Sequence, residues 1–299
     1  MTAGTLRRQA PDTARGELEL RRRAAAEQRW SRLTFWGGVA IVLAFPVLSA
    51  VHAFLGTGDP NAPDFDTILL SPSWAHPFGT DNLGRDLFAR VLAATPLDYL
   101  VGLVTTLVPM VLGVGLGLVA GYFGGMVDTL IMRLVDIVIA FPFLVFLLAA
   151  VAVFGPGLTG IYVGLITFGW ASFARVTRAE MLVLRERQFI SAARTLGLPG
   201  WRILAVHALP SALRPNLVLA MAAMVTNILS LAALSYLGLG VQPPQPEWGA
   251  IVADGQTYLI SSWWIATMPG LVIVLVGVGF SLIGDGLADR LGHDFRITA

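Results

Sequence analysis

A basic stretch from Arg175 to Asn216 reads RVTRAEMLVLRERQFISAARTLGLPGWRILAVHALPSALRPN and contains seven arginines. It lies in a chain of 299 residues that is 56% hydrophobic and only 13% charged, with a mean hydropathy of +0.72. Soluble proteins carry about 25% charged residues. The composition therefore indicates a membrane protein, in which so long a basic segment needs an explanation of its own.

Around this stretch lie six apolar runs, each near the roughly 20 residues that cross a bilayer. In chain order they are residues 33–55, 97–119, 130–154, 158–173, 217–237 and 263–283. The first run is longer than the core of a signal peptide, about 7–15 residues, so we expect it to stay as a helix. The sequence predicts an all-α, polytopic membrane domain over residues 33–299, preceded by a basic tail over residues 1–32.

The arginines predict the orientation of these spans. All 20 positive charges are arginine, and 18 of them fall on the side of the N-terminal tail if there are six spans. Because positive charges accumulate on the cytoplasmic side, we expect both termini and the basic segment there. Two outward loops remain, over residues 56–96 and 238–262.

Several kinds of chemistry lack their signatures. With no lysine in the chain, a Walker A loop is impossible. The chain has no cysteine, and its four histidines are scattered without ligand spacing. We found no serine-hydrolase elbow and no zinc-protease helix. The sequence thus predicts no catalytic residues, no metal site and no nucleotide site in this chain, and nothing in it predicts a nucleic-acid partner.

Polar residues inside the predicted spans are few. Their middles hold no Asp, Glu or Arg, which argues against an ion-coupled carrier, because such carriers keep a costly intramembrane charge for function. Thr226, Asn227 and Ser230 lie in the middle of one span. Groups of this kind usually hydrogen-bond between helices, and lining of a pathway is the alternative. In the first outward loop His76, Asp81 and Asp86 could suggest a nickel site. We instead expect Gly79, Asp81, Gly84 and Asp86 to be turn and cap residues, with Arg85 paired to either acid.

The basic segment is expected to fold as a helical hairpin. Residues 180–198 lack Pro and Gly until Gly197, and Pro199 follows, which is a helix-stop signal. A second short helix over residues 201–209 is expected to end at Pro210. The small residues Ser191, Ala192 and Ala193 are expected to be exposed near the tip, where they could enter a groove on another protein. The basic flanks could rest on anionic lipid, and the alternative is a hairpin that only seals the inner face.

The hairpin resembles the Glu-Ala-Ala signature of ABC-importer permeases: Glu-Ala-Ala, three residues, Gly, nine residues, Ile-x-Leu-Pro. Here the pattern is Ser191-Ala192-Ala193, Gly197 and His207-Ala208-Leu209-Pro210. Ser191 replaces the glutamate and His207 replaces the isoleucine. An ion pair at the signature carboxylate is therefore not expected, and docking would depend mainly on shape.

Four more motifs narrow the resemblance to the second, C-type permease subunit of dipeptide, oligopeptide and nickel importers. They are HPFGTDNLGRDLFAR (His76–Arg90), AGYFGG (Ala120–Gly125), LSYLGLGVQPPQPEWGAIVADG (Leu234–Gly255) and GDGLADRLG (Gly284–Gly292). Their order matches the family, and the resemblance covers about residues 33–294.

The resemblance implies the type I importer fold, like that of the methionine permease, and a set of partners. These are a second, homologous permease, two ATPase subunits that bind ATP and Mg²⁺, an extracytoplasmic substrate-binding protein and membrane lipid. It also implies that residues 189–198 form a coupling helix in an ATPase groove, with no cofactor in this chain. The residues expected to couple are Phe189, Ser191, Ala192, Ala193, Leu196, Gly197, Leu209 and Pro210.

The resemblance implies a peptide as the commonest cargo, with nickel or another small solute as the alternative. Two readings from other classes remain. A carrier or channel acting alone is disfavoured by the absence of an intramembrane charge, and an intramembrane enzyme by the absence of a catalytic pair.

Overall fold

The protein is described by a computed structural model that covers residues 10–56 and 58–297, with side-chain environments for residues 30–56 and 58–291. Within this part of the chain, regular structure is helical, apart from one isolated bridge between Thr80 and Asp86. The all-α prediction is confirmed.

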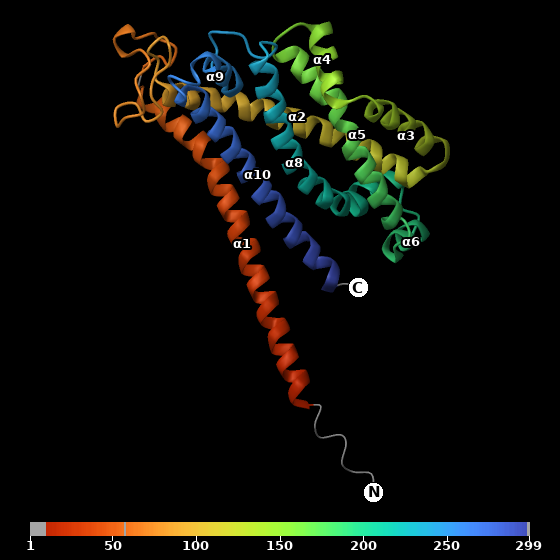
Figure 1. Ribbon diagram of the computed structural model, residues 1–299. Coiled ribbons are helices and arrows are strands. Elements are labelled where there is room, and N and C mark those ends of the chain that lie inside the picture. Colours follow the sequence, from red (N-terminus) through yellow and green to blue (C-terminus); the bar gives the residue numbers. More distant parts are fainter. Residues whose placement is uncertain (1–9, 57, 298–299) are drawn as a thin grey trace.

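Most helices follow one another with short connections, and the long loop over residues 56–86 separates α1 from α2 (Figure 1). The α-helices are α1 (Ala10–Leu55), α2 (Leu87–Phe123), α3 (Gly125–Ala140), α4 (Phe143–Phe154), α5 (Leu158–Leu184), α6 (Gln188–Thr195), α7 (Gly200–Arg202), α8 (Leu209–Tyr236), α9 (Trp248–Asp254) and α10 (Trp264–Ile297). Two 3₁₀ turns, η1 (Phe65–Thr67) and η3 (Gln256–Tyr258), and one π-helical turn, η2 (Ile203–Ala208), complete the set.

Four helical stretches are long and apolar enough to cross a membrane. They are Trp30–Leu55, Leu87–Phe123, Gly200–Tyr236 and Trp264–Leu291. A fifth candidate is the pair α3 and α4, which meet at 88°. The described residues therefore form a polytopic membrane protein with four or five candidate spans. The helix α5, predicted as a span over residues 158–173, continues to Leu184 and is not among them.

The predicted span over residues 130–154 is not one straight helix. The chain turns at Phe141 and Pro142, between α3 and α4. Phe141 adopts an extended conformation, with φ −79° and ψ 137°, because the ring of a following proline disfavours the helical region.

The expectation that a short helix ends at Pro210 is wrong. The chain stays helical from Gly200 to Tyr236. The π-helical turn η2 ends at Ala208, two residues before Pro210, and the Leu209 amide donates to the Leu204 carbonyl. Because the helix is widened there, the Pro210 ring is accommodated without ending the helix.

Glycines bring α2 and α5 into close contact. A Cβ atom added at Gly113 would lie 2.4 Å from the Trp170 carbonyl oxygen, and one at Gly117 would lie 2.5 Å from that of Ala174. One at Gly121 would lie 2.6 Å from the Cβ of Met181. These three glycines, spaced four residues apart, thus let α5 approach α2 closely.

The two terminal helices lie side by side at one edge of the fold, where Figure 1 shows α1 alongside α10. Here Gly38 faces Gly279, and a Cβ at Gly38 would lie 2.6 Å from the Gly279 carbonyl oxygen. The tail predicted over residues 1–32 is helical from Ala10 onward as part of α1. Residues 1–9 of that tail lie outside the described residues.

Candidate functional site

The hairpin over residues 188–203 comprises α6, a turn, α7 and the first residue of η2. It is called the inner hairpin because the arginine distribution predicts it on the cytoplasmic side. Its inner side is apolar: Ile190, Ala193 and Ile203 are buried together, with Leu198 and Tyr122 packed against them. This periodicity, with apolar residues three apart, makes α6 amphipathic. The hairpin therefore has a small core of its own and presents a separate outer surface.

The outer surface of the hairpin carries most of the residues predicted to couple to a partner. Phe189 is 44% exposed and Leu196 is 81% exposed, and Ser191, Ala192 and Gly197 are also exposed. Trp201, at 70% exposure, extends this surface onto α7. Large apolar side chains exposed this far on a short helix favour contact with another molecule.

Three predicted coupling residues lie elsewhere. Ala193 was expected to be exposed, but it is only 4% exposed, because it faces the hairpin core three residues after Ile190. Leu209 is half-buried and Pro210 is exposed at the start of α8, beyond the hairpin. Leu209 and Pro210 therefore lie where the chain enters α8, and not at the tip of the hairpin.

Gly197 ends α6 as predicted. Its φ is +75°, in the left-handed region. Its amide donates to the Arg194 carbonyl at 2.9 Å, and the Leu198 amide donates to the Ala193 carbonyl at 3.2 Å. These two bonds form a Schellman motif, which satisfies carbonyls that the helix end would leave unpaired.

The stem of the hairpin is the part of α5 around Arg175–Arg178, which is held by contacts with α3 and α8. Arg178 of α5 contacts both carboxylate oxygens of Asp128 in α3 at 2.5 Å, and Arg175 contacts Asp136 at 2.9 Å. On the other side of α5, the buried Asn216 of α8 donates to the Thr177 hydroxyl at 2.8 Å. Because bidentate arginine–carboxylate pairs fix orientation as well as distance, α5 enters the hairpin in a defined position.

The mid-span polar residues mostly serve packing. Asn227 is 8% exposed and donates to the Thr105 carbonyl at 3.1 Å and to the Thr106 hydroxyl at 3.0 Å, which links α8 to α2. Ser230 donates to the Thr226 carbonyl at 2.7 Å within α8. Thr226 is the exposed member of the predicted set.

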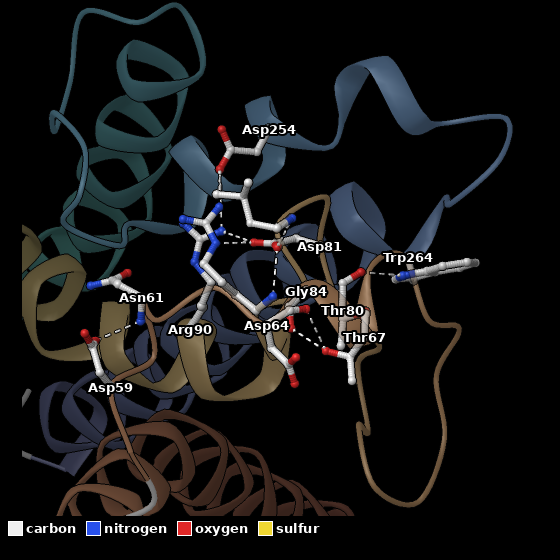
Figure 2. A network of polar contacts seen from close by, with 12 residues as sticks. Asp59, Asn61, Asp64, Thr67, Thr80, Asp81, Gly84, Arg90, Asp254 and Trp264 are labelled. Carbon is white, nitrogen blue, oxygen red and sulfur yellow. Dashed lines mark hydrogen bonds and ion pairs between the residues drawn. The ribbon is translucent and has the colours of Figure 1, made fainter.

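The loop before α2 and the segment around α9 form the outer cap, named for the side on which the arginine distribution predicts it. Figure 2 shows Arg90 lying between Asp81 and Asp254. Asp81 is fully buried and accepts from Arg85 Nε at 2.7 Å and from Arg90 Nη1 at 2.8 Å. Asp254, at the end of α9, lies 3.5 Å from Arg90 Nη1. Charges thus join two loops that are far apart in the sequence.

The predicted turn and cap residues of the first outward loop behave as expected. The Asp86 carboxylate caps α2 by accepting from the Ala89 amide at 2.8 Å, and it lies 2.7 Å from His76 Nδ1. Gly79 and Gly84 have φ of +76° and +73°, as tight turns require. Among the residues described, no group of three or more His, Cys, Asp or Glu is arranged to hold a metal ion.

Two residues, Asp254 and Tyr122, make tertiary contacts that the sequence did not predict. Asp254 lies in the GAIVADG motif, whose acid had no assigned partner. Tyr122 lies in AGYFGG, a motif in which the sequence assigns no contact to any residue. In both cases the resemblance marked the motif, but only the tertiary contacts show what the side chain touches.

With the geometry in place, comparisons with known proteins identify the chain's family. Residues 113–297 match the family described as binding-protein-dependent transport system inner membrane component. The chain belongs to this family. It is a multi-pass permease of the inner membrane, and as the permease component of an ABC importer it functions with ATPase and binding-protein chains.

Curated relatives cover nearly the whole permease. A probable D,D-dipeptide transport system permease protein, DdpC, of Escherichia coli K12 is 40% identical over 87% of each chain. The dipeptide permease DppC of Alkalihalophilus pseudofirmus is 40% identical over 85% of this chain and 84% of its own length. The glutathione permease GsiD of Pectobacterium atrosepticum matches at the same identity and over the same shares.

A solved structure supports the fold. The methionine ABC transporter MetNI in an inward-facing conformation contains a chain that aligns with a TM-score of 0.54 and 18% identity. The alignment covers 69% of this permease and 95% of that chain. The likeness concerns the fold alone, which matches the expected type I importer architecture.

Proposed function

We propose that this permease imports short peptides, forming half of the translocation pathway beside a second, homologous permease. The supporting observation is that the relatives at 40% identity are named for dipeptides and for glutathione, itself a tripeptide. The family resemblance in the outward loops points to the same cargo. Nickel or another small solute is the alternative.

In this proposal the chain crosses the membrane six times, with both termini in the cytoplasm. The spans are four long helices, the bent pair α3–α4 as one, and α5. Support for α5 comes from its length of 27 residues and from its glycine-lined packing on α2. At about 1.5 Å per residue, such a helix reaches roughly 40 Å, which is enough to cross the hydrocarbon core.

The inner hairpin then contacts an ATPase. Two ATPase subunits bind ATP and Mg²⁺, and their closure displaces α6. Phe189 and Leu196 supply exposed apolar contacts, and Ser191 and Ala192 allow close approach because they are small. The basic flanks of the hairpin rest against anionic lipid headgroups.

The test is transport by the complete complex in proteoliposomes. Labelled dialanine should accumulate when ATP, the ATPases, the second permease and the binding protein are all present, with unlabelled tripeptide or nickel as competitors. If nickel competes and the tripeptide does not, the cargo is nickel and not a peptide. Uptake by this chain alone without ATP would favour a carrier.

A matched pair of variants tests the docking surface. Leu196→Glu places a charge at the exposed tip, while Glu180→Gln changes a residue on α5 away from the tip. We expect Leu196→Glu to release the ATPases in a pull-down and Glu180→Gln to retain them. Retention by both variants would contradict the assignment of α6 as the docking element.

A further inference from the structure

Tyr122, at the inner end of α2, contacts two separate apolar clusters. One lies between membrane helices and includes Leu118, Met181 and Ala212. The other is the core of the inner hairpin, where Tyr122 packs against the cluster of Ile190, Ala193 and Ile203. The ring thus joins the hairpin to the helix bundle through side-chain packing.

The hairpin approaches the same ring from two sides. The guanidinium carbon of Arg194, in the last turn of α6, lies 4.7 Å from the ring centroid, within the range of a cation–π contact. Gly200, at the start of α7, faces the ring edge, because a Cβ atom there would lie 3.2 Å from Tyr122 Cε1. A side chain at position 200 would crowd the ring, so a glycine suits this position.

A polar contact beside the hairpin is weaker. Arg185, just after α5 and before the hairpin, donates to the Gly121 carbonyl at 3.4 Å, near the limit of a hydrogen bond. The outer face of α6, with Leu196 at its end, is exposed. Tyr122 therefore provides a packed contact that fixes the position of α6 relative to α2.

We propose that Tyr122 is the positioning residue of the coupling step: its ring holds the inner hairpin on α2, so that a displacement of α6 is passed to α2. The proposal rests on the proposed function of α6 as the ATPase contact. Since α2 continues without interruption to Arg90 in the outer cap, this contact is the inner end of a single helix that reaches both faces.

Distance measurements test the contact directly. The chain has no cysteine, so Ser191→Cys on α6 and Leu112→Cys on α2 can carry two spin labels in the assembled complex in nanodiscs. We expect a narrow distance distribution that keeps the same mean without nucleotide and with ATP plus vanadate. Tyr122→Ala should broaden it, whereas Tyr122→Phe, which keeps the ring, should not. Tyr236→Ala, which removes a phenol at the far end of α8, is the matched control.

The functional readout is the number of labelled dialanine molecules transported per ATP hydrolysed. We expect Tyr122→Ala to lower this ratio about fivefold, with Tyr122→Phe and Tyr236→Ala close to the parent complex. A narrow distribution or an unchanged ratio in Tyr122→Ala would overturn the proposal. If Leu196→Glu still releases the ATPases in that case, only the role of Tyr122 fails. If Leu196→Glu has no effect either, the proposed docking of α6 fails as well.

Discussion

Asp81 and Arg90 form a buried ion pair at the outer cap, with the Asp81 carboxylate 2.8 Å from Arg90 Nη1 and exposures of 0% and 5% for the two residues. Because Arg90 lies in the first turn of α2, the pair fixes the preceding loop on the end of a membrane helix. Because neither charge is well solvated, each is stabilised mainly by the other.

Asp81→Asn should therefore destabilise the permease strongly. The change leaves Arg85 and Arg90 without their buried carboxylate, and breaking a buried pair costs about 3–5 kcal/mol. Asp254→Asn is the matched control, because the Asp254 side chain is 46% exposed and its contacts are 3.5 and 3.8 Å long. We expect a loss below about 1 kcal/mol there. Thermal unfolding in detergent measures both, and a larger loss for Asp254→Asn would contradict the assignment.

The backbone conformation of Gly197 predicts which substitutions are tolerated there. At φ +75°, asparagine is tolerated better than a β-branched residue. Gly197→Val should cost about 1–2 kcal/mol of hairpin stability and reduce substrate-stimulated ATPase activity of the complex, and Gly197→Asn should have a smaller effect. Because a Cβ at this position meets no atom within 4 Å, a steric clash within the chain does not explain the difference. Equal activity for the two variants would speak against a conformational cause.

Gly117 and Gly115 form a matched pair on α2. A Cβ at Gly117 would lie 2.5 Å from the Ala174 carbonyl oxygen, whereas one at Gly115 meets nothing within 4 Å. Gly117→Ala should push α5 away and cost about 1–3 kcal/mol. Gly115→Ala should be neutral or stabilising by up to about 1 kcal/mol, since alanine favours helix. The midpoint of thermal unfolding measures both, and equal shifts would argue against close packing at Gly117.

Substitutions of Asn227 and Thr226 distinguish a role in helix packing from a role in lining the pathway. Asn227→Leu removes the bonds to Thr105 and Thr106 and should lower stability by about 1 kcal/mol, as for other hydrogen bonds between membrane helices. Thr226→Val should leave stability unchanged, because the Thr226 hydroxyl bonds only within its own helix, to Ala222. A change in transport with unchanged stability in Thr226→Val would assign Thr226 to the pathway. If transport and stability are both unchanged, Thr226 faces lipid.

Local backbone chemistry was predictable from the sequence. The stop at Gly197 and the cap at Asp86 each follow from a local property of one residue, and the structure agrees with both. The long apolar runs also predicted membrane helices, since the required length is set by the bilayer.

Features that depend on distant parts of the chain were not predictable. The 88° turn at Pro142 and the passage of the helix through Pro210 involve the same residue type with opposite outcomes. The difference lies in the surrounding backbone, an extended Phe141 in one case and a π-helical turn in the other. The burial of Ala193 depends on Ile203, which returns to it after a turn, and the contact of Asp254 with Arg90 joins residues 164 positions apart.

The interlock of α2 with α5 limits where this permease can flex. Glycine-to-backbone contacts at Gly113 and Gly117 leave no clearance for the two helices to slide past each other, because packed interfaces switch between discrete arrangements and do not deform continuously. We therefore expect the outer cap and the stem of the inner hairpin to move together. Alternating access would then have to come from hinges outside it, and the sharp joint between α3 and α4 is one position where the backbone already departs from a straight helix.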